Sequence, residues 1–308
     1  MDYREALLLW AARETGILEA VTTVAGTPER VAAEAGVTER AARITLDAMV
    51  ELGYLEVVED DEGADQYEIT NRALGFVAKT DVRSIGSVPH ALDCVERWFE
   101  LPETMRTGEA PAKPDEWTTN FAGAMASVDD ATVRAGVTAA VHRNPDADRV
   151  LDAGGGPGVF AKEFVRRGFD VTLVDRPEIV QIDRRFLDHE PIDLVEEDVT
   201  ADLPTGFGLV FCSRIAHALG PDQNRALLDN AFEALDPGGA VVLLDKVRGR
   251  APDAALFGAH MLAQTDRGDT YTEGRFREWL ENAGFEAVEV RDVPGTELQV
   301  IAGRRPRN

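Results

Sequence analysis

The amino-acid sequence predicts an α/β protein, with a Rossmann-like sheet in its C-terminal half and a mainly helical winged-helix domain before it. A buried-strand pattern, a glycine-rich turn and a helix pattern follow one another between Asp148 and Phe160. Strand and helix patterns alternate from there onward, whereas the first 80 residues read as helices followed by a hairpin. At 308 residues the chain exceeds the usual size of one hydrophobic core, so two domains are expected.

Helical periodicity and a hairpin pattern fill the N-terminal segment. Thr27 and Thr38 each stand where a threonine caps the start of a helix. Residues 54–58 and 66–70 then alternate apolar and polar side chains, as two paired strands do. Helix, turn, helix and hairpin together predict a winged-helix domain over residues 1–82.

A winged helix invites comparison with DNA-binding regulators, but its charge argues against that role here. Residues 1–80 carry roughly twice as many acidic as basic side chains, and the turn at residues 59–65 that would meet phosphate is itself acidic. We therefore expect a structural or dimer-forming domain, with the apolar segment Leu7–Trp10 as a candidate partner surface. A ligand-sensing regulator that binds DNA is kept as the non-enzymatic alternative.

Residues 83–145 are predicted to form a helical connector that also supplies the wall of a substrate pocket. The helical pattern is irregular, and we expect interruptions at Pro102 and near Trp117. Trp117, Phe121 and Met125 are candidate wall residues for an apolar or aromatic molecule, although packing in a core is the more frequent role of such side chains.

The formal net charge of −24 at pH 7 is extreme, and only four of the 32 basic residues are lysines. Such a surface resembles that of haloarchaeal proteins, in which salt screens the repulsion between hydrated carboxylates by shortening the Debye length to about 3 Å at 1 M. We therefore expect stability that depends on salt. The same charge argues against binding to nucleic acid or to anionic membranes.

Targeting and cysteine patterns indicate a cytoplasmic protein. No run approaches the roughly 20 apolar residues of a membrane span, and the first residues lack the pattern of a signal peptide. Cys94 and Cys212 fall in different predicted elements, so we expect reduced thiols without a disulfide and no metal site.

The segment that contains Gly154, Gly156 and Gly158 predicts a nucleotide-binding junction between a strand and a helix. Glycines leave out side chains where the backbone turns sharply and where a ligand approaches the helix N-terminus. The next strand ends at Asp175, about 20 residues on, where a carboxylate would grip a ribose diol. Nicotinamide dehydrogenases share this spacing and are kept as an alternative.

Other strand ends carry further candidates for binding a cofactor. Asp152 precedes the glycines and resembles the first signature of class I methyltransferases, while Asp198 follows the third strand and Ser213 closes the fourth. Residues 235–245 match the helix-end turn and fifth strand that follow in that fold. This resemblance implies S-adenosylmethionine as the cofactor of a Rossmann-like catalytic domain over residues 146–308, with a carboxylate near the adenine amine at Asp198.

Both halves of the chain together resemble one family, the dimeric O-methyltransferases typified by plant caffeate-type and bacterial hydroxyneurosporene-type enzymes. In these enzymes a catalytic histidine follows the fourth strand, and the stretch here reads Ile215-Ala216-His217-Ala218-Leu219, with Ala218 and Leu219 in place of aspartate and tryptophan. The resemblance implies a seven-stranded sheet, a homodimer formed through the N-terminal domain and a small-molecule acceptor.

The resemblance also implies that His217 is the general base that removes the proton of an acceptor hydroxyl. Asp245 is then its orienting carboxylate, because the other orienting acid of the family is replaced by Thr270 here. A histidine suits this task because it titrates at about pH 6.5 when unperturbed. Packing at a strand-helix turn is the structural alternative for His217, and transfer to carbon, nitrogen or sulfur, or loss of transfer, is the chemical alternative.

Overall fold

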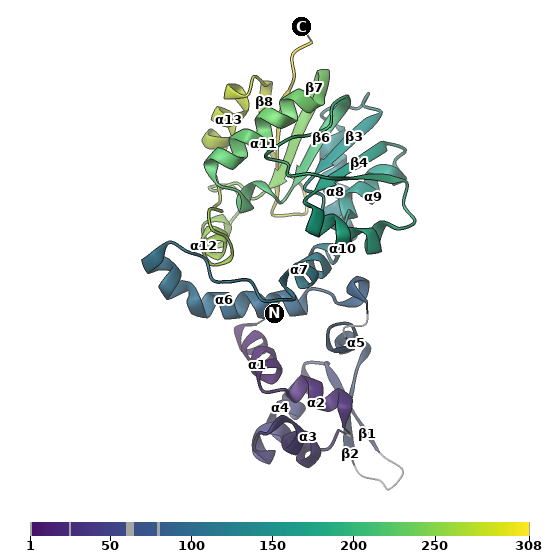
Figure 1. Ribbon diagram of the computed structural model, residues 1–308, viewed down its shortest axis with the longest axis vertical. Coiled ribbons are helices and arrows are strands. Elements are labelled where there is room, and N and C mark those ends of the chain that lie inside the picture. The colour runs from purple at the N-terminus through teal and green to yellow at the C-terminus, as the bar shows by residue number, and fades with distance from the viewer. Residues whose placement is uncertain (1, 25, 60–64, 79–80, 308) are drawn as a thin grey trace. The chain divides into compact units, whose positions relative to one another are not determined.

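The computed structural model describes residues 2–24, 26–59, 65–78 and 81–307 (Figure 1). Residues 60–64, which make up most of the predicted acidic turn, lie outside these described residues.

The chain forms two compact units, each with its own core. Unit 1 comprises Met1–Glu96 and Pro114–Ala124, and unit 2 comprises Arg97–Lys113 and Met125–Asn308. The segment 83–145, predicted to be a connector, is therefore divided between the two units.

Unit 1 is mainly helical and contains one two-stranded antiparallel sheet. The side chains of Thr27 and Thr38 accept hydrogen bonds from backbone N–H groups at the starts of α3 and α4, as predicted for caps. Leu9, Leu46 and Met49 are among its fully buried core residues. The prediction of a helical N-terminal region is confirmed. Its elements are α1 (Tyr3–Glu14), α2 (Ile17–Thr23), α3 (Pro28–Ala35), α4 (Glu39–Glu51), β1 (Leu55–Glu59), β2 (Asp65–Ile69), α5 (Asn71–Ala78) and the 3-10 helix η1 (Val82–Ser84).

Three helices lie in the predicted connector, and the first two, α6 and α7, differ from the prediction. Helix α6 runs without interruption from Val88 to Thr107, so the expected break at Pro102 is wrong. A proline inside a helix costs about 3 kcal/mol, and the burial of the neighbouring Leu101 helps to offset that cost. Helix α7 (Trp117–Ala126) begins at Trp117, so this residue starts a helix where an interruption was expected.

Unit 2 is built around a seven-stranded sheet, as predicted. Its remaining elements are α8 (Asp130–Val141), β3 (Arg149–Ala153), α9 (Val159–Arg166), β4 (Asp170–Asp175), α10 (Pro177–Leu187), β5 (Ile192–Glu196), β6 (Phe207–Ser213), the 3-10 helix η2 (Ala216–Ala218), α11 (Pro221–Ala234), β7 (Leu235–Asp245), α12 (Ala254–Gln264), α13 (Glu273–Asn282), β8 (Glu286–Asp292) and β9 (Gln299–Arg304).

The order of the strands is β5-β4-β3-β6-β7-β9-β8, and only the pairs of β9 with β7 and with β8 are antiparallel. The order reverses between β3 and β6, so the carboxyl ends of these two strands form the switch point where open α/β sheets bind ligands. The turn predicted within residues 235–245 lies inside β7, where the pairing with β6 shifts. Phe207 pairs with Leu235 and Leu209 pairs with Ala240, so residues 236–239 form a bulge in β7.

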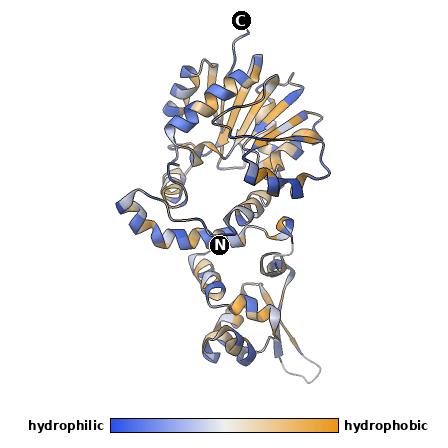
Figure 2. Cartoon of the chain, viewed as in Figure 1, coloured by the Kyte–Doolittle hydropathy of each residue, from blue (hydrophilic) through white to orange (hydrophobic). Residues whose placement is uncertain are grey.

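Helices cover both faces of this sheet (Figure 1). Helices α11 and α13 pack on one face through residues such as Leu227 and Trp279, and α8 and α9 pack on the other through residues such as Val137 and Phe164. The central strands are mostly apolar, whereas the helices carry polar residues on their outer sides (Figure 2). Within the described ranges no helix is long and apolar enough to cross a membrane.

Candidate active site

The glycine-rich turn joins β3 to α9 at the switch point of the sheet. Gly154, Gly156 and Gly158 have φ angles of +73°, +51° and +69°, in the left-handed region that favours glycine. Gly158 is also the N-cap of α9. A Cβ atom on Gly155 would lie 2.8 Å from Oδ2 of Asp152. The turn therefore leaves bare backbone beside a helix N-terminus, where the polar groups of a nucleotide can approach.

Asp175 closes β4 beside this turn and is held by two backbone groups. Its Oδ2 accepts a hydrogen bond from the N–H of Gly156 at 3.0 Å, and its Oδ1 accepts one from the N–H of Arg176 at 2.8 Å. Burial raises the pKa of Asp175, and these two hydrogen bonds oppose the shift. The carboxylate thus braces the turn from the end of the neighbouring strand.

Asp152 and Asp183 are two more carboxylates of this region, and both are fully buried. Neither side chain has a hydrogen-bond partner among the described residues. Burial and the nearby charge of Asp175 raise the pKa of Asp152 to about 7, against a weak opposing effect of the Ala161 N–H. Burial, Asp175 and Asp152 raise the pKa of Asp183 to about 8.

Sequence reasoning missed Asp183, although a signal was available. Val180, Asp183 and Leu187 are the buried residues of α10, and their helical spacing places the aspartate on the apolar face. Among the described residues, no three side chains of His, Cys, Asp or Glu are grouped so as to hold a metal ion.

The ends of β5 and β6 place the other two predicted cofactor residues differently. Asp198 is exposed, and its Oδ1 caps its own turn by accepting from the N–H and hydroxyl of Thr200. The Ser213 hydroxyl is buried and lacks a hydrogen-bond partner among the described residues. Arg214, which follows it, has a φ of +56°, a conformation that costs a non-glycine residue energy and is often found at functional sites.

His217 and Asp245 are brought together from two neighbouring strand ends. Nδ1 of His217 lies 2.7 Å from Oδ1 of Asp245, and the backbone N–H of His217 donates to Oδ2 at 3.2 Å. Asp245 is almost fully buried and also accepts the N–H of Lys246 at 2.7 Å. A carboxylate that accepts from Nδ1–H fixes the tautomer in which Nε2 carries a free lone pair.

The turn that carries His217 is held by groups from α11 and from the loop before α13. The side-chain amide of Asn224 donates to the carbonyls of Ala216, Leu219 and Gly220. The backbone N–H of Asp269 donates to the carbonyl of His217 at 3.0 Å.

Tyr271 adds another contact to this turn. Its hydroxyl donates to the Leu219 carbonyl at 2.6 Å, while its ring packs edge-on against Trp279. Thr270 does not reach His217, because its hydroxyl donates to the Ala254 carbonyl. Asp245 is thus the carboxylate that contacts the histidine.

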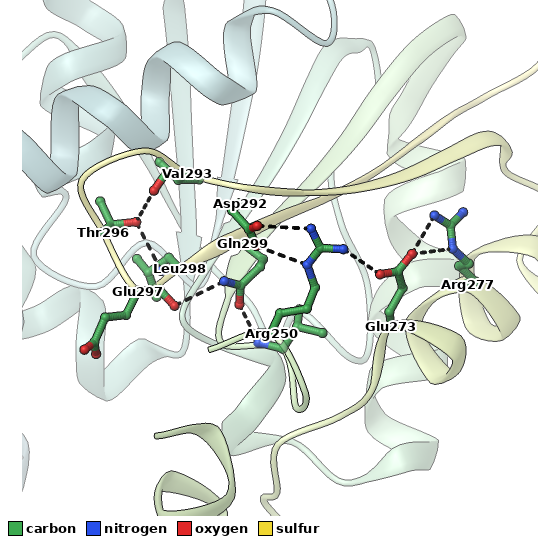
Figure 3. A network of polar contacts seen from close by, with 10 residues as sticks. Arg250, Glu273, Arg277, Asp292, Val293, Thr296, Glu297, Leu298 and Gln299 are labelled. Carbon is green, nitrogen blue, oxygen red and sulfur yellow. Dashed lines mark hydrogen bonds and ion pairs between the residues drawn. The ribbon is translucent and has the colours of Figure 1, made fainter. Parts of the chain in front are cut away.

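A polar network fixes the segment that follows Asp245. Figure 3 shows the guanidinium of Arg250 between the carboxylates of Asp292 and Glu273, with Arg277 on the far side of Glu273. The side chain of Gln299 accepts the backbone N–H of Val247 at 2.8 Å in the same network. The loop after β7 is therefore tied both to α13 and to the β8-β9 hairpin.

A row of aromatic rings extends from His217. Phe257 meets His217 edge-on, with 4.9 Å between ring centroids, and stacks on His260 at 5.7 Å. His260 in turn stacks on Trp98, which donates its indole N–H to Nδ1 of His260 at 3.0 Å. Sequence reasoning missed Phe257 and His260, although they stand at helical spacing on α12.

The candidate wall residues belong to both units. Trp117 and Phe121 pack edge-on against His90 within unit 1, with centroid distances of 4.8 and 5.3 Å, whereas Met125 belongs to unit 2. Their assignment to a substrate wall stays a prediction.

Comparison with known proteins gives a family for this chain. A model of the methyltransferase domain matches residues 125–290. A 3-hydroxy-5-methyl-1-naphthoate 3-O-methyltransferase of Streptomyces sahachiroi is 30% identical, over 96% of this chain and 90% of that protein. The tetracenomycin polyketide synthesis 8-O-methyl transferase TcmO of Streptomyces glaucescens is 29% identical, over 94% of this chain and 91% of the relative.

The same fold occurs in the crystal structure of human N-acetylserotonin methyltransferase in complex with S-adenosylmethionine. That structure superposes with a TM-score of 0.71 at 22% identity, over 98% of this chain and 94% of the human one. The domain model matches more than half of the chain, and the naphthoate enzyme matches nearly all of it. The chain therefore belongs to the S-adenosylmethionine-dependent O-methyltransferases.

Proposed function

We propose that this enzyme methylates a hydroxyl group on a small aromatic acceptor, with His217 as the general base and Asp245 as the carboxylate that orients it. The observation that carries this proposal is the pair of contacts between Asp245 and the ring and backbone of His217. A histidine that merely packs in a turn does not need a buried carboxylate that contacts both its ring Nδ1 and its backbone N–H. The side chain of His217 also keeps 14% of its surface exposed, which leaves the ring accessible.

The residues of the glycine-rich turn fit S-adenosylmethionine, which supplies a methyl group on a positively charged sulfur when bound. Both oxygens of Asp152 are buried without a hydrogen-bond partner among the described residues, as expected for a group that awaits a polar or cationic ligand. Asp175 stands at the strand end where a ribose diol is gripped in such folds. We assign these two carboxylates, with Gly154, Gly156 and Gly158, to the cofactor site, and Asp198 and Ser213 to its edge.

In this proposal His217 removes the proton of the acceptor hydroxyl through Nε2. The negative charge of Asp245 stabilises the imidazolium that results, and the fixed Nδ1–H keeps Nε2 aimed at the hydroxyl. General base catalysis of this kind contributes about 10²- to 10⁴-fold. The rest of the rate comes from holding the acceptor oxygen in line with the methyl group.

An aromatic acceptor is favoured by the rings beside His217 and by the relatives. Phe257 offers an apolar ring next to the proposed base, and aromatic rings pair well with one another in offset or edge-on contacts. The two relatives compared above are named for a naphthoate and for a tetracenomycin polyketide step. Trp117, Phe121 and Met125 are proposed as further acceptor contacts.

For the N-terminal region we propose a winged-helix dimerisation domain over residues 1–82, so that the enzyme works as a homodimer. Exposed apolar side chains on α1, Tyr3 and Leu7, support a partner surface there. The net charge of −24 supports a haloarchaeal-type, salt-adapted protein of the cytoplasm.

The proposal is tested by incubating the purified enzyme in molar salt with S-adenosylmethionine and a panel of hydroxynaphthalenes and hydroxybenzoates. Mass spectrometry should find a methyl ether on at least one hydroxyarene and an equal amount of S-adenosylhomocysteine. His217→Asn should bind S-adenosylhomocysteine normally in calorimetry and form little ether. Methyl transfer to carbon, nitrogen or sulfur, or full activity of the variant, would contradict the proposal.

A further inference from the structure

His260 is the one imidazole of the ring row that the proposed chemistry does not use. It stands on α12 and is half-buried. Its ring stacks on Phe257, and the same Phe257 ring also contacts the ring of His217. An acceptor molecule that lies along Phe257 can therefore reach both His217 and His260. This makes the hydrogen-bonding state of His260 relevant to acceptor choice.

The tautomer of His260 is determined by Trp98. An indole N–H can only donate, so Nδ1 of His260, 3.0 Å away, must accept with its lone pair. The proton of the neutral ring is consequently on Nε2. Within the described part of the chain no residue accepts a hydrogen bond from this Nε2–H group.

The same surroundings keep His260 neutral. Burial, with smaller contributions from the nearby His217 and Arg97, lowers its pKa to about 4. Protonation would also place a hydrogen on Nδ1, directly opposite the indole N–H. Lys246, whose ammonium lies 5.2 Å from the centroid of the Phe257 ring, is paired with the carboxylates of Asp253 and Glu297.

We propose that His260 is a specificity-determining residue whose Nε2–H, fixed by Trp98, hydrogen-bonds a neutral carbonyl oxygen of the acceptor. The acceptor class is then a hydroxyarene that also carries a ketone, quinone or amide carbonyl across the ring system from the methylated hydroxyl. A carboxylate is disfavoured, because an anion would be matched by a charged imidazole and this one is held neutral. The inference rests on the proposed function and narrows its acceptor.

The test uses three matched acceptors, 6-acetyl-2-naphthol, 6-ethyl-2-naphthol and 6-hydroxy-2-naphthoate, with the wild type and the variants His260→Leu and His260→Gln. For His260→Leu we expect KM for the acetyl compound to rise about three- to tenfold, as for the loss of one hydrogen bond, while KM for the ethyl compound and kcat stay within about twofold. Gln, which keeps an N–H donor, should recover part of the loss. The exposed His189→Leu serves as the matched control.

A second measurement addresses the role of Trp98 without any acceptor. Nitrogen-15 NMR of the histidine rings should show that His260 is neutral at about pH 5.5 in the wild type, with its single ring proton on Nε2. In Trp98→Phe, which keeps a ring but removes the donor, we expect a mixture of tautomers, a higher titration point and a KM for the acetyl compound that varies with pH.

The possible failures are distinguishable. If the wild type methylates none of the three naphthols, the proposed function is contradicted for this acceptor class and the inference with it. If it methylates them but His260→Leu changes KM equally for the acetyl and ethyl compounds, or if the naphthoate is preferred, only the assignment of His260 is overturned. A wild-type His260 protonated near pH 6.5 would overturn it as well.

Discussion

Gly154 and Ile215 lie in direct contact, so that a Cβ atom added to the glycine would overlap the end of the isoleucine side chain. Gly154 belongs to the turn after β3, and Ile215 stands two residues before His217 in the turn after β6. The proposed cofactor turn and the turn that carries the proposed base are thus packed against each other through the side chain of Ile215. Their separation is set by the missing side chain of residue 154.

We predict that Gly154→Ala weakens S-adenosylhomocysteine binding at least about tenfold and lowers kcat, because the new methyl group must displace Ile215 or the cofactor turn. Calorimetry and steady-state kinetics measure both effects. Gly168→Ala is the matched control, since Gly168 also has a positive φ but no atom within 4 Å of the added Cβ. If the two variants behaved alike, backbone strain and not the contact with Ile215 would be the cause.

Removal of either member of the His217–Asp245 pair should slow catalysis without removing the cofactor. For His217→Asn and Asp245→Asn we expect kcat to fall by about 10²- to 10⁴-fold, while S-adenosylhomocysteine affinity changes less than about threefold. The effects of the two changes should not add in the double variant, because the residues act as one unit. If kcat of the double variant fell by the product of the two single fold decreases, His217 and Asp245 would have independent roles.

The strand ends were predictable from the sequence for a simple physical reason. Parallel strands are buried on both faces and read as apolar runs, so a carboxylate such as Asp175 at the end of a run is visible, and the order of strands brings those ends together. Both the choice of His217 and its pairing with Asp245 followed from the family resemblance, since sequence separation alone gives no contact.

The ring row was not predictable in the same way. Trp98 and His260 are 162 positions apart, and the helical pattern near Trp98 was expected to break at Pro102. A break there would have ended the helix shortly after Trp98. Tertiary burial overrode the local preference of proline, and this is information that a single sequence does not carry.

Tyr271→Phe should separate the support of the histidine turn from its chemistry. Loss of the hydroxyl leaves the partly buried Leu219 carbonyl with Asn224 as its donor, so we expect the free energy of unfolding to fall by about 1 kcal/mol and kcat/KM to fall several-fold. Urea unfolding and kinetics give the two values. Tyr3→Phe, at a side chain that is 71% exposed, should change neither. An unchanged kcat/KM in Tyr271→Phe would show that the turn does not need this bond.

Salt should stabilise the protein strongly if the acidic surface is an adaptation. With a net charge of −24, we expect Tm to rise steadily between about 0.1 M and 2 M NaCl, as the Debye length falls from about 10 Å to below 3 Å. Calorimetric scans at several salt concentrations measure the change. A neutral osmolyte at the same osmolality serves as the control, and a Tm that does not depend on salt would contradict the proposed adaptation.

The raised pKa of Asp183 predicts that the protein loses stability as pH rises. Its pKa is raised to about 8 in the folded protein, against 3.8 for the ordinary side chain, so between these values the native state binds more protons than the unfolded state. Stability must then decrease with rising pH through this window. Asp152, with a pKa of about 7, acts in the same direction.

Asp183→Asn removes this charge while keeping the shape of the side chain. We expect the stability advantage of the variant over the wild type to grow by about 1–3 kcal/mol between about pH 5.5 and about pH 8.5, because over this range the unfolded wild type carries an ionised Asp183 while the native carboxyl keeps its proton until about pH 8. Urea unfolding in molar salt at both pH values measures the difference, and the exposed Asp188→Asn at the end of the same helix is the control. Part of the pH dependence should persist through Asp152. A variant that is less stable than the wild type at about pH 8.5 would mean that the ionised Asp183 has a cationic partner in the native protein.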